Sequence, residues 1–176
     1  EFIKNTNNFE KVFHSGVDIK EIKIDKSKFG DVFFVSENKE FAKSFGGKTA
    51  KLNELFLDGN ANLVDLVDLD GKTFDKIKAV VDKRTRTFDN KGITIKEAIG
   101  KELNFNPFSK ETVLQGIKDG KAYFAELPAM QEVYKELGFD GMITQELKGA
   151  SNIGIFNPDI LKTKQQLIDI FEQANE

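Results

Sequence analysis

The first third of the chain shows apolar runs of strand length. They are short, rich in Phe, Val and Leu, and bounded by Gly, Ser and Asn, which is typical of strands. We therefore expect strands at residues 10–14, 30–36 and 51–57, with a shorter one near 62–66. Between the second and third of these, Phe41, Ala42 and Phe45 fall on one side of a helix, for which Ser36 is the expected N-cap.

Between Gly71 and Leu127 the apolar positions change to a helical period. Phe74, Ile77 and Val80 recur three residues apart, which places them on one face of a helix. Ser109 is a suitable N-cap for another helix. We expect helices near 73–84, 94–103 and 109–119.

The last fifty residues contain the clearest helix. Apolar residues recur with helical spacing over 129–137, and Gly138 follows as the residue that ends the helix. Two strands are expected next, near 141–145 and 152–156. Thr163 and Gln166 have the spacing of a capping box, which predicts that a closing helix begins there.

Grouped strands interrupted by a long helical stretch are typical of the α+β class with mostly antiparallel strands. A length of 176 residues with 39% hydrophobic and 31% charged residues suits one domain with a substantial core. We therefore predict a single domain spanning 1–176, with a helical insertion at about 71–127 between the two halves of the strand region.

Composition narrows the possible functions. The chain has no cysteine and one histidine, which argues against a disulfide framework and against a metal site. A net charge of -3 does not support nucleic-acid binding through phosphate contacts. No apolar run approaches the roughly 20 residues of a membrane span, so no membrane association is expected. Because the chain starts at Glu1, we expect it to be a piece of a longer protein.

The candidate chemistry is concentrated between Val12 and Gly46. His14 ends an apolar strand and is followed by Ser15 and Gly16, where a ligand can approach the backbone. The segments that carry the remaining pattern are Gly30–Ser36, Ala42–Gly46, Leu137–Ile143 and Ile153–Lys162, which read GDVFFVS, AKSFG, LGFDGMI and IGIFNPDILK.

These segments, in this order, resemble the ADP-ribosyltransferase family, in particular its branch with a His, Tyr, Glu triad and the related domains of phage and mobile-element polyvalent proteins. The resemblance implies a split β-sandwich with an NAD cleft, where NAD is the substrate and ADP-ribose is transferred to an acceptor, most often a protein. It further implies a toxin-like domain that acts in the cytoplasm or is delivered into a host cell within a larger protein.

The resemblance also assigns roles to residues. His14 would donate a hydrogen bond to a ribose, and Ser15 and Gly16 would hold the nicotinamide carboxamide. Phe33 takes the place of the triad tyrosine. The remaining cofactor-binding residues are Ser44 and Phe45, of which Phe45 would stack on the nicotinamide ring.

The position of the family's catalytic glutamate is held by Asn152, which can grip a ribose hydroxyl but supplies no negative charge. Glu146, at the end of the preceding strand, could place a carboxylate in the same cleft. Each of these residues also has a structural interpretation: His14 as a strand-end histidine, Phe33 and Phe45 as core aromatics, and Glu146 as part of a solvated loop.

Two arginines, Arg84 and Arg86, suit either a pyrophosphate contact or a solvated helix end. For the chain as a whole, the alternatives to an active transferase are a catalytically inactive module that binds NAD, ADP-ribose or a protein partner, and an unrelated α+β domain.

Overall fold

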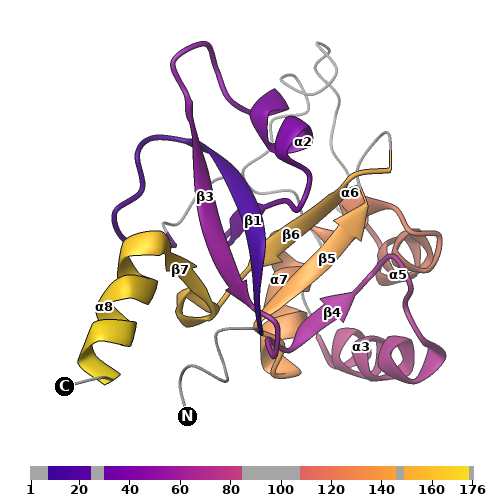
Figure 1. The fold of residues 1–176 in the computed structure, drawn as a ribbon. Helices are drawn as coiled ribbons and strands as arrows, with labels where there is room; N and C mark the ends of the chain where they lie inside the picture. Colours follow the sequence, from indigo (N-terminus) through magenta and orange to yellow (C-terminus); the bar gives the residue numbers. More distant parts are fainter. Residues whose placement is uncertain (1–7, 25–29, 85–107, 146–148, 175–176) are drawn as a thin grey trace.

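Two β-sheets and a layer of helices make up the fold (Figure 1). The computed structural model describes residues 8–24, 30–84, 108–145 and 149–174. The first sheet has the order β1-β3-β7 and contains the strands Phe9–Gly16, Lys51–Asp58 and Leu161–Thr163. The second has the order β2-β6-β5-β4 and contains Phe33–Val35, Ser151–Ile155, Gly141–Gln145 and Leu63–Asp65. Every strand pair is antiparallel except β4 with β5.

One hydrophobic cluster joins the two sheets. Val12 of β1 and Leu55 of β3 pack in it with Ile153 and Ile155 of β6. Alternate residues of a strand face opposite sides of its sheet, so one face of β6 contributes to this cluster while Asn152 and Gly154 face the other way. At one end the sheets are also tied together directly, because Phe13 and Ser36 exchange two backbone hydrogen bonds.

A second cluster packs helices against the other face of the four-stranded sheet, as Figure 1 shows. The helices are α3 (Gly71–Lys83), α5 (Lys110–Lys118), α6 (Ala122–Ala125) and α7 (Pro128–Glu136). Tyr134 of α7 is fully buried there, and its hydroxyl donates a hydrogen bond to the carbonyl of Ala125 at 3.1 Å. Burial, with a smaller contribution from the charge of Glu126, raises the pKa of the Tyr134 phenol and keeps it a donor.

Asp140 connects three strands of the four-stranded sheet. Its carboxylate accepts hydrogen bonds from the backbone N–H of Asn62 at 3.0 Å and from the side-chain amide of Asn157 at 2.9 Å. Its carbonyl accepts from the backbone of Phe156 at 2.8 Å. The GFDG and FNP segments of the sequence therefore hold each other in place, and their role here is structural.

The α+β class and the mostly antiparallel strands predicted from the sequence are confirmed. Helices 73–84, 109–119 and 129–137 correspond to α3, α5 and α7, and Gly138 ends α7 with a φ of 82°. The capping box of Thr163 and Gln166 is present at the start of α8 (Lys164–Ala174). The helix expected at 94–103 lies outside the described residues.

The N-cap predicted for the helix near residue 40 is wrong. Helix α2 spans Lys39–Ser44 and is capped by Asn38, whose side-chain oxygen accepts from the N–H of Phe41 at 2.9 Å. The hydroxyl of Ser36 instead donates to the carbonyl of Ser151 across the sheet at 2.7 Å. This long-range contact fixes Ser36, the residue directly after β2, and does not cap the helix.

Candidate active site

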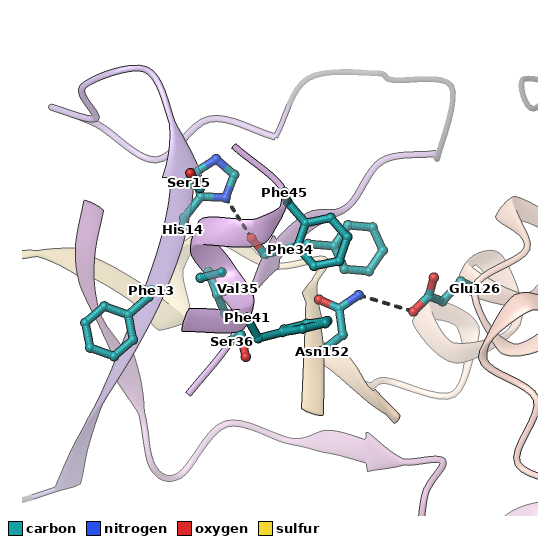
Figure 2. A pocket seen from close by; sticks show the side chains of 11 residues that line it. Phe13, His14, Ser15, Phe34, Val35, Ser36, Phe41, Phe45, Glu126 and Asn152 are labelled. Carbon is teal, nitrogen blue, oxygen red and sulfur yellow. Dashed lines mark hydrogen bonds between the residues drawn. The ribbon is translucent and has the colours of Figure 1, made fainter. Parts of the chain in front are cut away.

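A cavity of about 360 Å³ lies between the end of β1, the end of β2 and helix α2 (Figure 2). We call it the α2 pocket. Its wall is mainly aromatic and aliphatic, with polar groups at two places. The residues that line it are Phe13, His14, Ser15, Phe34, Val35, Ser36, Phe41, Ala42, Phe45, Glu126 and Asn152.

His14 forms one polar part of the α2 pocket and is held from two sides. Its Nδ1 lies 2.8 Å from the carbonyl oxygen of Phe34, which can only accept, so Nδ1 carries the proton. Its ring stacks on Phe33 with the centroids 4.4 Å apart. With the proton on Nδ1, Nε2 of the neutral imidazole is an acceptor.

Phe33 is not among the lining residues of the α2 pocket, in contrast to the position expected for it. Adjacent residues of a strand face opposite sides. Phe33 packs against the cluster between the sheets and supports the His14 ring, whereas Phe34 lines the pocket. The aromatic residue of β2 that lines the pocket is thus Phe34.

Helix α2 supplies the aromatic wall. Phe41 and Phe45 contact each other edge to face, with ring centroids 4.8 Å apart. Phe45 is 64% exposed, which is unusual for a phenylalanine and leaves a face of its ring available. Ser44 does not line the pocket, and its hydroxyl donates to the carbonyl of Phe41 at 2.6 Å.

Ser15 lines the α2 pocket, whereas Gly16, which was also expected to hold the ligand, is not among its lining residues. A Cβ on Gly16 would lie 2.8 Å from Nε2 of His14, closer than side chains pack. Glycine is therefore required for the imidazole to keep its position. The loop that follows is fixed by Asn53, whose side chain bonds the N–H of Ile19 at 2.9 Å and the carbonyl of Val17 at 2.8 Å.

Asn152 and Glu126 form the second polar part of the α2 pocket. Asn152 is 8% exposed, and its amide nitrogen donates to Oε1 of Glu126 at 3.3 Å, as Figure 2 shows. Thr144, the register partner of Asn152 on β5, donates its hydroxyl to the same oxygen at 2.6 Å. The pocket therefore contains the half-buried carboxylate of Glu126 next to Asn152, where the sequence indicated only an amide.

Sequence reasoning missed Glu126, because it lies between α6 and α7 within the segment assigned to the helical insertion. No local pattern marks it as a site residue. Glu146, the carboxylate expected in this role, lies outside the described residues, and so does Arg86. Arg84 follows the last residue of α3, and its guanidinium contacts Glu132 and Glu136 at 3.0 and 2.9 Å, so it is an ion-paired helix end and not the solvated one that was expected.

Neither a metal centre nor a membrane-spanning helix occurs in the described part of the chain. Within it, no three His, Cys, Asp or Glu side chains are grouped so that they could hold a metal ion. None of the helices described has the length and apolar composition needed to cross a membrane.

The fold and the α2 pocket thus define an α+β protein with a small aromatic cleft that holds one imidazole and one carboxylate. No protein-family model and no curated protein matches the sequence. Among solved structures, the chain is similar to the crystal structure of an anti-CRISPR protein, with 16% identity and a TM-score of 0.46. That similarity covers 88% of this chain and 94% of the other. At this level it supports no statement about function.

Proposed function

We propose that this chain is an ADP-ribosyltransferase-like domain that binds NAD as a substrate in the α2 pocket. It would transfer ADP-ribose to an acceptor, most often a protein, and release nicotinamide. The observation that carries the proposal is that one cavity brings together His14, the exposed face of Phe45 and a carboxylate, from elements far apart in the sequence.

The charge of the α2 pocket favours one end of NAD over the other. Glu126 is its one acidic lining residue, and none of the described lining residues is Lys or Arg. Such a wall suits the cationic nicotinamide ring and not the pyrophosphate. A volume of about 360 Å³ is at the low end of ligand pockets, which run from about 300 to 1,000 Å³, so the pocket suits the nicotinamide riboside half.

Each part of that half has a matching group. Phe45 offers a π-face to the pyridinium ring, and such stacking contributes about 0.5–1.5 kcal/mol beyond buried area. Nε2 of His14 can accept a hydrogen bond from a ribose hydroxyl, since Nδ1 already donates to Phe34. The hydroxyl of Ser15, which also lines the pocket, is the proposed hydrogen-bond partner of the nicotinamide carboxamide.

The reaction then breaks the bond between C1′ of the ribose and the nitrogen of nicotinamide. Both electrons of that bond leave with the nitrogen, so the pyridinium becomes neutral nicotinamide and positive charge develops on C1′. A nucleophilic atom of the acceptor forms the new bond to C1′ and gives its proton to solvent. A fixed negative charge beside C1′ lowers the barrier of this step.

Incubation of the protein with NAD, with and without candidate protein acceptors, followed by mass spectrometry of nicotinamide, tests the proposal. Nicotinamide release that depends on the protein is expected. NAD binding without release would instead favour the catalytically inactive module, to which Asn152 points. Absence of NAD binding would refute the transferase, and would leave only an inactive module that binds ADP-ribose or a protein partner. Because the reaction consumes NAD, we further propose that the domain acts in the cytoplasm, or in a host cell into which a larger protein delivers it.

A further inference from the structure

The backbone around Glu126 is fixed more firmly than a connection between two helices requires. Its N–H donates to the carbonyl of Ala122 at 2.8 Å, and its carbonyl accepts from the side chain of Gln131 at 2.9 Å. The preceding carbonyl, that of Ala125, accepts from Tyr134 at 3.1 Å. Gln131 and Tyr134 are 1% and 0% exposed, so two fully buried polar side chains hold this one position.

The carboxylate itself is oriented by a separate pair of groups. Thr144 and Asn152 face each other across β5 and β6, and both donate to Oε1. These donors come from the sheet, whereas the groups that hold the backbone come from the helices. Glu126 is thus fixed from two layers of the fold while its side chain still lines the α2 pocket.

From this geometry we infer that Glu126 is the catalytic carboxylate of the proposed reaction and that Thr144 and Asn152 are positioning residues that orient it. The inference rests on the proposed function. It assigns the negative charge to the connection between α6 and α7 instead of β6, where the resemblance had implied a glutamate. Asn152 then has a role of its own, because an amide can donate to a carboxylate and a second glutamate cannot.

The chemistry of the step fits a charge at this place. Positive charge appears on C1′ only as its bond to nicotinamide breaks, so a fixed carboxylate stabilises the transition state more than the bound substrate. Glu126 takes up no proton in this step, and its contribution is electrostatic. Two donors on one oxygen keep it oriented without reorganisation.

The test compares the parent with Glu126→Gln, which keeps an oxygen for Thr144 and removes the charge. Nicotinamide release should fall by roughly 10²–10³-fold. NAD affinity, measured by calorimetry, should fall by less than about tenfold, because losing the charge weakens the attraction for the cationic ring of bound NAD less than it weakens the stabilisation of C1′ in the transition state. Glu172→Gln, which removes an exposed glutamate of α8, is the matched control and should leave both values unchanged.

Two further measurements distinguish a catalytic role of Glu126 from a merely structural one. Urea unfolding should show Glu126→Gln folded and close to the parent in stability. Thr144→Val and Asn152→Ala should lower turnover less than Glu126→Gln does. They should also move the acid limb of the pH–rate profile to higher pH, because the ionised carboxylate loses a donor.

The outcomes distinguish this inference from the proposed function. If the parent releases nicotinamide and Glu126→Gln does so equally well, the assignment of Glu126 is overturned while the function stands. Loss of activity in Glu146→Gln alone would overturn that assignment in the same way. If the parent binds NAD without turnover, the catalytic assignment is again overturned. If the parent does not bind NAD, the proposed function fails first.

Discussion

Replacing Asn152 with aspartate is the sharpest test of the geometry of the α2 pocket, and it needs no ligand. The change exchanges the amide nitrogen, 3.3 Å from Oε1 of Glu126, for a second carboxylate oxygen. Two unit charges at that separation repel by about 5 kcal/mol at an effective dielectric constant of 20. The protein can avoid this repulsion by keeping one proton on the pair.

Proton uptake limits the cost. Protonating a carboxyl group of ordinary pKa near 4 at pH 7 costs about 4 kcal/mol, at 1.36 kcal/mol per pH unit. Because Glu126 is half-buried and solvent screens part of the repulsion, we expect about 1–3 kcal/mol from charge. The lost hydrogen bond adds about 0.5–1.5 kcal/mol. The variant should therefore be about 1.5–4.5 kcal/mol less stable at pH 7.

The sign of the pH dependence follows from linkage. The shared proton raises the apparent pKa of the carboxyl pair in the folded variant above its unfolded value. Stability from that proton is fully present below about pH 4 and is lost as the pH rises through the raised value. Urea unfolding at several pH values between 4 and 8 measures this change in stability. Asn152→Leu, which loses the hydrogen bond without adding a charge, should show a smaller loss of stability that changes less with pH. An Asn152→Asp variant that tracks Asn152→Leu at every pH would refute the contact with Glu126.

Three further predictions concern the α2 pocket and the fold. His14→Ala should weaken NAD binding by about 1–3 kcal/mol in calorimetry if a ribose contact is lost, and unchanged affinity would exclude that contact. Gly16→Ala should also weaken binding, because its Cβ would lie 2.8 Å from Nε2 of His14, while the melting temperature stays near that of the parent. Thr163→Ala should lower the free energy of unfolding by about 0.5–2 kcal/mol, since it removes the cap of α8, and should leave NAD affinity unchanged. A loss of NAD affinity as large as the loss of stability would show that the cap of α8 and the α2 pocket are coupled.

The sequence was most informative where a structure is decided locally. Ser109 caps α5 through a hydrogen bond to the N–H of Thr112, and Thr163 and Gln166 cap α8 reciprocally. Both caps depend on residues three positions apart in the chain, and a sequence pattern can detect such a spacing. The cap of α2 was missed because Ser36 bonds Ser151, more than a hundred residues away, and only the folded sheet brings them together.

The candidate site was partly predictable for the same reason. His14, Ser15, Phe45 and Asn152 line the α2 pocket as the resemblance implied, but their chemical roles remain proposals. Phe33 and Phe34 are adjacent, and the choice between them depends on which face of β2 meets the neighbouring sheet. Glu126 could not be found, because its position depends on the packing of α6 and α7 against β5 and β6.

The central claim, that the α2 pocket is an NAD site, can be tested on one side chain. The chain has a single histidine, so the imidazole signals of His14 are unique in a nuclear magnetic resonance spectrum. Titration with NAD should shift those signals to saturation, with nuclear Overhauser contacts between nicotinamide protons and the ring of Phe45. His14 signals that stay in place up to millimolar NAD would contradict the account.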